Sequence, residues 1–130
     1  MNDAVNSPSH YVQAGTPLEP IDVIRSAPFD LSNVIKYLCR AGYKDDELQD
    51  LKKAKRYVAY AAESCALDPE PYNYFMKSKG LLLSKLRPLS EIKTYSAQFL
   101  IYELESLINK RIRAIERKQA EMSKQSTSEE

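Results

Sequence analysis

The chain has 130 residues, of which 43% are hydrophobic and 28% are charged. This length suffices for one domain with a modest core and argues against a second independent domain. The formal net charge of +1 provides no overall field that would gather a polyanion, so we expect no binding of duplex DNA, and any anion site must be a local cluster.

The cysteines and the hydropathy pattern indicate the compartment. Cys39 and Cys65 are too far apart for a C-x-x-C metal or redox motif, and each falls where a helix would bury it. No segment has the roughly 20 consecutive apolar residues of a membrane-spanning helix, and the N-terminus "MNDAVNSPSH" is polar rather than signal-like. We therefore expect a cytoplasmic protein with no membrane partner.

Residues 1–20 are predicted to form an arm, because proline recurs there and lacks the backbone donor that a helix needs. The core of the fold is expected in residues 21–66. A short helix through "PIDVIRSA" precedes a longer one with Asp30 as its N-cap and Gly42 as a left-handed C-terminal stop. The apolar stripe of the longer helix has the spacing i, i+3, i+4, i+7 and consists of Leu31, Val34, Ile35 and Leu38.

A second long helix is predicted to begin after Asp46, which forms a capping-box pattern with Gln49. Its seam alternates spacings of three and four and includes small residues that let another helix approach closely: Leu51, Ala54, Val58, Ala61 and Cys65. Pro69 and Pro71 break this helix, and a shorter helix interrupted by Gly80 follows.

The last predicted helix runs from Ser90 to about Met122, a stretch without proline or glycine. Its stripe consists of Ile101, Leu104, Ile108 and Ile115, with Arg111 where another apolar residue is expected. Because such a helix is longer than a small domain, we expect this stripe to pack against another subunit. The predicted fold is an all-α helical bundle of residues 1–122, with C-terminal helices in residues 70–122, a disordered tail in residues 123–130, and assembly as a homo-oligomer.

The predicted helix after Pro28 carries a cationic face. Asn33, Lys36 and Arg40 share this face at spacings of three and four, with Tyr37 beside them and no carboxylate among them. Two cations and an amide suit phosphate oxygens, which the planar fork of arginine matches in particular, and tyrosine is a platform for a base. The alternative interpretation is a solvated surface.

His10 is the single histidine of the chain and lies in the proline-containing segment "SPSHY". It is a candidate catalytic residue on an arm that could fold over a ligand, and the alternative is an ordinary surface or packing residue.

The acidic run Asp45, Asp46, Glu47 and Asp50 could hold Mg²⁺, because carboxylates one helical turn apart can share a hard cation. Acids at a helix start are also favoured by the helix dipole, and Asp50 is expected to pair with a surface lysine, Lys53 or Lys55. We therefore predict no metal ligand; Mg²⁺ is compatible with the site but not required.

The three glycines form neither G-x-x-x-x-G-K-[ST] nor G-x-G-x-x-G, so the usual glycine-rich phosphate cradles are lacking. A nucleotide would have to be held by side chains and helix ends.

Four blocks in order, "NSPSHY", "EPIDVI", "NVIKYLCRAGYKDD" and "DLKKAKRYV", resemble a small phage-encoded family, long described as a domain of unknown function, that includes the early nucleotide kinase of T-odd coliphages. The resemblance covers roughly Val5 to Ala62. It implies a bacteriophage origin and, by the kinase member, phosphoryl transfer between deoxynucleotides without a P-loop. The residues that match the family pattern include Pro8, His10, Tyr11, Ile21, Asp22, Asn33, Lys36, Tyr37, Arg40, Lys44, Asp50, Leu51, Lys53, Ala54 and Tyr57.

The sequence therefore predicts a nucleotide-binding protein of a phage-infected cell, resembling a nucleotide kinase. The predicted nucleotide-binding residues are Asn33, Lys36, Tyr37, Arg40, Tyr11 and Lys44. In the enzymatic version Lys36 and Arg40 stabilise the transferring phosphoryl group, and His10 or Asp50 orients the acceptor.

Two other functions remain open. The first is a non-catalytic sponge that sequesters a cyclic nucleotide used as a host-defence signal, a form of counter-defence. The second is a metal-dependent nucleotide pyrophosphohydrolase. Glu47 and Asp50 could form one of its carboxylate pairs, but Glu103 and Glu105 are expected to point to different sides and make a poor second pair.

Overall fold

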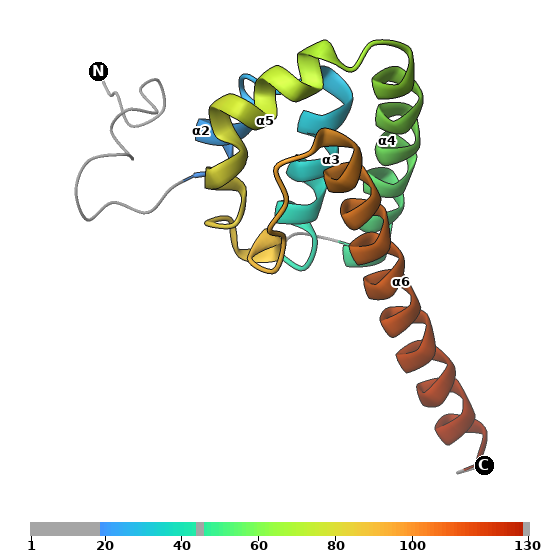
Figure 1. The fold of residues 1–130 in the computed structure, drawn as a ribbon. Helices are drawn as coiled ribbons and strands as arrows, with labels where there is room; N and C mark the ends of the chain where they lie inside the picture. The colour runs from blue at the N-terminus through green and yellow to red at the C-terminus, as the bar shows by residue number, and fades with distance from the viewer. Residues whose placement is uncertain (1–18, 44–45, 129–130) are drawn as a thin grey trace.

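The computed structural model describes residues 19–43 and 46–128. These residues form α-helices and one 3₁₀ helix, with no strand in the part described, which confirms the all-α class (Figure 1). The elements are α2 (Pro20–Ile24), α3 (Phe29–Arg40), α4 (Glu47–Leu67), α5 (Glu70–Leu83), η2 (Arg87–Leu89) and α6 (Ala97–Ser128).

Helix α3 buries the predicted stripe of leucine, valine and isoleucine against the rest of the fold. It ends before Gly42, whose φ of 92° is the left-handed conformation expected of a glycine stop. The start of α3 differs from the prediction: its N-cap is Pro28, and Asp30 lies within the first turn. There the Asp30 carboxylate accepts hydrogen bonds from the Ser64 hydroxyl of α4 (3.0 Å) and the Tyr72 hydroxyl of α5 (3.3 Å).

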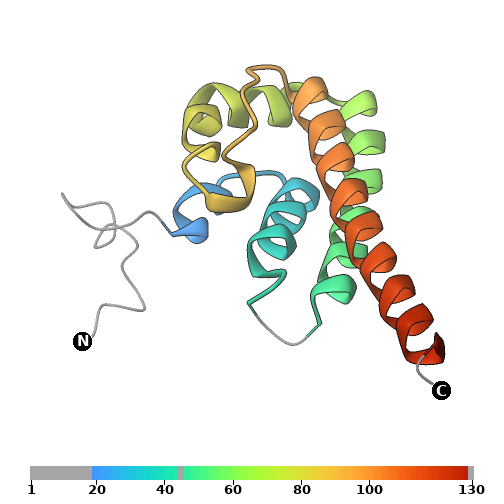
Figure 2. The same cartoon turned by 90° about the horizontal axis from the view of Figure 1, so that it is seen from below.

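Helix α4 begins as predicted, because the Asp46 carboxylate accepts a hydrogen bond from the backbone N–H of Gln49 at 3.1 Å. Its predicted seam is buried: Leu51, Ala54, Val58, Ala61 and Cys65. Both α3 and α6 pack on α4, and the small alanines of the seam allow α6 to lie alongside it (Figure 2).

Helix α5 contains Pro71, which was expected to break the preceding helix, and Gly80, which was expected to interrupt this one. Pro71 lies in the first turn, where backbone N–H groups have no intrahelical acceptor, so the N–H that proline lacks is not needed there. Gly80 lies inside the helix. Phe75, Met76 and Leu83 are buried in the common core. Their burial stabilises a helix that its sequence alone disfavours.

Helix α6 begins at Ala97, not at Ser90 as predicted. The hydroxyl of Ser96 accepts a hydrogen bond from the N–H of Phe99 at 3.4 Å and so marks the helix start. The helix then continues past Met122 through Ser128, so residues 123–128 are helical where a disordered tail was predicted.

The predicted stripe of α6 is buried within the chain itself. Ile101, Leu104 and Ile108 pack in the core with α4, and Ile115 is partly buried. The expectation that this stripe requires another subunit is therefore wrong for its first three residues. Beyond them the helix extends past the other elements (Figures 1 and 2). No helix among the described residues has the length and apolar character needed to cross a bilayer.

Candidate functional site

The cationic face of α3 lies beside one face of α4, and together they form what we term the α3–α4 surface. Its members are Phe29, Asn33, Lys36, Tyr37 and Arg40 of α3 with Asp50, Lys53, Tyr57 and Tyr60 of α4. Helical spacings of three, four and seven place each set on one side of its helix.

Aromatic rings form the centre of the α3–α4 surface. Tyr37 stacks on Tyr57 with ring centroids 6.0 Å apart and planes 13° apart. Phe29 and Tyr60 each meet Tyr57 edge-on at 6.0 Å. Both arrangements are those that the ring quadrupole favours. The rings thus form a cluster around Tyr57, in which Phe29 is 71% exposed and Tyr60 48% exposed, so these two side chains present aromatic surface to solvent.

Two ammonium groups converge on the same ring. Lys36 Nζ lies 5.0 Å and Lys53 Nζ 5.5 Å from the centroid of Tyr37, within the range of a cation–π contact. Lys36 was predicted as a site residue, whereas Lys53 was considered only as one of two possible partners of Asp50. The sequence could have indicated Lys53 as a site residue, because it precedes Tyr57 by four positions and both residues therefore lie on one face of α4.

Arg40 has a carboxylate partner, contrary to the prediction of an unbalanced face. Its Nε lies 3.3 Å from Oδ2 of Asp50. Asp50 was expected to pair with a surface lysine, but its side chain is only 3% exposed, against 37% for Arg40. Neither atom makes a hydrogen bond of good geometry with another described residue. Asp50 therefore positions Arg40 and is not exposed to act on a substrate.

Asn33 lies on the predicted face, but its amide Nδ2 donates a hydrogen bond to the carbonyl oxygen of Phe29 at 2.9 Å. This contact stabilises the first turn of α3 and uses one of the two amide N–H donors of Asn33, which leaves the second N–H and the side-chain oxygen available to a ligand. The remaining predicted site residues, His10, Tyr11 and Lys44, lie outside the described residues.

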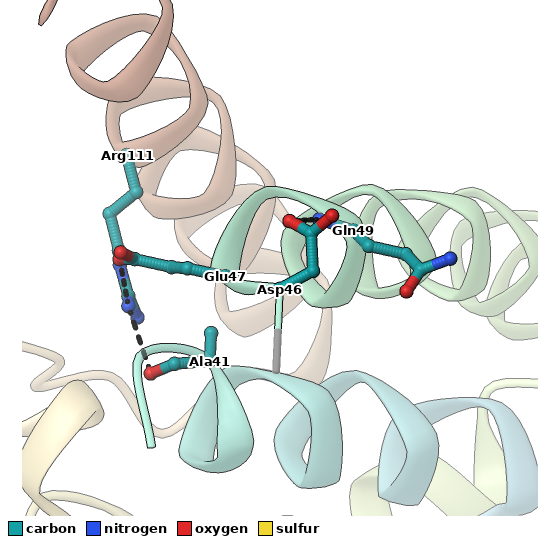
Figure 3. A network of polar contacts seen from close by, with 5 residues as sticks. All are labelled: Ala41, Asp46, Glu47, Gln49 and Arg111. Carbon is teal, nitrogen blue, oxygen red and sulfur yellow. Dashed lines mark hydrogen bonds and ion pairs between the residues drawn. The ribbon is translucent and has the colours of Figure 1, made fainter. Parts of the chain in front are cut away.

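The acids considered as metal ligands have other contacts. Glu47 Oε2 lies 3.1 Å from Nη2 of Arg111, which also donates to the carbonyl oxygen of Ala41 at 3.4 Å (Figure 3). Asp46 caps α4, as described above. Within residues 19–43 and 46–128, no three His, Cys, Asp or Glu side chains are grouped to hold a metal ion. Asp45 lies outside the described residues.

The two cysteines are free thiols. Burial raises the pKa of Cys39 from 9.0 to about 11, against a smaller lowering by the Arg111 guanidinium. Burial also raises the pKa of Cys65. Both groups are therefore protonated thiols near neutral pH, and neither is activated as a nucleophile.

Comparison with known families places similarity in the N-terminal part of the chain. The model of a family described as a protein of unknown function (DUF3310) matches residues 5–59. This segment contains α2, α3 and the first part of α4, and thus every member of the α3–α4 surface except Tyr60. No curated protein and no solved structure matches the chain.

Proposed function

We propose that the protein binds a nucleotide on the α3–α4 surface. The observation that carries this proposal is the convergence of Lys36 and Lys53 on Tyr37, which is itself stacked on Tyr57. Cations beside an aromatic platform match the two chemical parts of a nucleotide, its phosphate and its base.

The charges of the surface favour an anion. Three cations, Lys36, Arg40 and Lys53, are opposed by one carboxylate, that of Asp50, which leaves a formal charge of +2. The ion pair with Asp50 holds the arginine side chain in one orientation, so less conformational entropy is lost when its guanidinium meets a phosphate.

The base would stack on exposed aromatic surface. The 6.0 Å between the centroids of Tyr37 and Tyr57 leaves no room for a base between these two rings, because stacked rings are separated by about 3.5 Å on each side. The exposed rings of Phe29 and Tyr60 provide the free faces. Stacking contributes about 1 to 3 kcal/mol per base and tolerates any base.

The resemblance to the phage nucleotide kinase family supports phosphoryl transfer to a deoxynucleoside monophosphate as the reaction. An oxygen of the acceptor phosphate would attack the terminal phosphorus of a donor nucleotide, and the bond from that phosphorus to the leaving phosphate oxygen would break. Lys36 and Arg40 would stabilise the charge that develops. His10 would orient the acceptor, since Asp50 is engaged with Arg40.

A second candidate is sequestration of a cyclic nucleotide without turnover, as counter-defence in a phage-infected bacterial cell. The burial of Asp50 in an ion pair favours it, because this carboxylate was one of two candidate catalytic groups. The two functions differ in product: an enzyme releases an altered nucleotide, whereas a sponge returns its ligand intact.

We also propose self-association through the part of α6 that passes the other helices (Figure 1). This part exposes Met122 and only partly buries Ile115, so it presents apolar side chains that a second copy of the chain could cover. Sedimentation should show an assembly larger than one chain at micromolar concentration, and a monomer at that concentration would contradict self-association.

The experiment for the proposed function is identification by mass spectrometry of small molecules released when the purified protein is denatured, followed by incubation with deoxynucleoside monophosphates and a nucleoside triphosphate. A bound nucleotide that is recovered unchanged and is not phosphorylated supports sequestration. Formation of deoxynucleoside diphosphate supports the kinase. Absence of any bound or binding nucleotide contradicts both.

A further inference from the structure

A pocket of about 500 Å³ lies where the end of α3 meets η2 and α6. Its walls include Leu38, Ala41, Tyr43, Arg87, Pro88 and Arg111. It shares none of these residues with the α3–α4 surface. Two arginines and no acidic residue line it. Because Arg111 is paired with the Glu47 carboxylate beside the pocket, the formal charge of the site is +1, supplied by Arg87.

Arg87 of η2 lines this pocket and has N–H donors that make no hydrogen bond within the described residues. Its Nη1 donates a hydrogen bond to the hydroxyl of Tyr43 at 2.7 Å, and within the part of the chain that the structure describes it forms no ion pair with a carboxylate. A guanidinium has five N–H donors, and this contact uses one of them. Because the Tyr43 oxygen accepts from Arg87, its own proton can be donated to a ligand oxygen.

Arg111 enters from α6, at the position in the apolar stripe where the sequence predicts another apolar residue. Its Nη2 contacts Ala41 O and Glu47 Oε2 (Figure 3). These contacts fix the direction of the side chain but involve one of its three nitrogens. They join α6 to the end of α3 and the start of α4, and they leave Nε and Nη1 of Arg111 available to a ligand.

We propose that this pocket binds the phosphate group of a small organic phosphate, with Arg87, Arg111 and the Tyr43 hydroxyl as donors. Two guanidinium groups from different elements can hold several phosphate oxygens at once, which is the geometry that arginine serves best. The partly exposed ring of Pro88 would contact the organic part of the ligand. This site is separate from the proposed nucleotide site and does not depend on it.

The test uses pyrophosphate as the probe, titrated into the full-length protein at about 0.15 M salt to screen non-specific charge effects. Calorimetry should show binding, and the amide signals of Gly42 and Tyr43 should shift in ¹⁵N-correlated NMR spectra. Arg87→Ala should weaken binding by about ten-fold or more, since a charge-assisted contact is lost. Arg87 is exposed, so its loss should leave the melting temperature unchanged.

Lys85→Ala is the matched control, because Lys85 is an exposed cation two residues away that does not line the pocket. The proposal is overturned if wild type does not bind pyrophosphate, if Arg87→Ala binds it as tightly as wild type, or if Lys85→Ala weakens it equally. Lys36→Ala separates the two sites. If that variant loses pyrophosphate binding while Arg87→Ala retains it, the pocket proposal fails and the α3–α4 proposal stands.

Discussion

Arg40 Nε lies 3.3 Å from Asp50 Oδ2, and this ion pair joins the last turn of α3 to the first turn of α4. Its two members differ in their access to water. The Asp50 side chain is almost fully buried, whereas more than a third of the Arg40 side chain is exposed. The pair therefore combines a structural role for Asp50 with a surface on which Arg40 can meet an anion.

This difference predicts unequal effects of removing the two partners. Arg40→Ala leaves a buried carboxylate without its cation and should lower the free energy of unfolding by about 2 to 4 kcal/mol. Asp50→Asn leaves an arginine that can turn toward water and should cost about 1 kcal/mol. Urea denaturation measures both. Equal losses, or a larger loss for Asp50→Asn, would contradict this account of the pair.

The carboxylate of Asp30 links three helices through the hydroxyls of Ser64 and Tyr72. Asp30→Ala removes the acceptor of both and should lower the free energy of unfolding by about 2 kcal/mol. Asp30→Asn keeps an oxygen acceptor and should cost less. Thermal melts of the two variants check this order, and a loss as large for Asn as for Ala would show that the negative charge, not the acceptor, is what stabilises the fold.

The raised pKa of Cys39 predicts slow reaction of this thiol. In a Cys65→Ser background, alkylation of folded protein at pH 8 should be much slower than in denaturant, because the thiolate is the reactive form. Rapid alkylation of the folded protein at that pH would contradict the burial of Cys39.

The same shift makes a prediction about stability at alkaline pH. Since the folded-state pKa of about 11 lies above the unfolded value of 9.0, the protonated thiol of Cys39 contributes fully to stability below pH 9. This contribution declines as pH rises from 9 to about 11. Cys39→Ala should therefore lose less stability than wild type over this interval in denaturation series, and parallel curves would contradict the shift.

The helices of this protein could be predicted largely from local signals. The stripe from Leu31 to Leu38, the left-handed Gly42 and the cap at Asp46 each depend on a few neighbouring residues, and each was predicted correctly. The start of α6 also had such a signal in Ser96, but the absence of proline and glycine after Ser90 obscured it. A segment without proline or glycine can be helical, but the absence of these residues does not by itself make it a helix.

The contacts of the site depended on tertiary packing and were harder to predict. Asp50 and Arg40 are ten residues apart on two helices, so their pairing follows from how α3 and α4 meet and not from spacing on either helix. Arg111 contacts residues more than sixty positions away. The cationic face of α3 could be predicted from the sequence. The contact of Lys53 with Tyr37 and the stacking of Tyr37 on Tyr57 could not, because both depend on how α4 packs beside α3.

Nucleotide binding on the α3–α4 surface should not require a metal ion. Lys36, Arg40 and Lys53 supply the charge that would otherwise come from Mg²⁺. Binding of a deoxynucleoside monophosphate, measured by calorimetry, should therefore persist in excess chelator. Loss of binding on chelation, restored by Mg²⁺, would assign the phosphate to a metal site instead.

The central claim is that Lys36 and Lys53 hold a nucleotide phosphate beside Tyr37, and calorimetric titration of lysine variants with the four deoxynucleoside monophosphates tests it most directly. Lys36→Ala and Lys53→Ala should each weaken binding by about ten-fold, the loss of one charge-assisted contact. Lys55→Ala is the control, because two residues along α4 turn its side chain by about 200° away from Lys53. Unchanged affinity in both Lys36→Ala and Lys53→Ala, or an equal loss in Lys55→Ala, would contradict the claim.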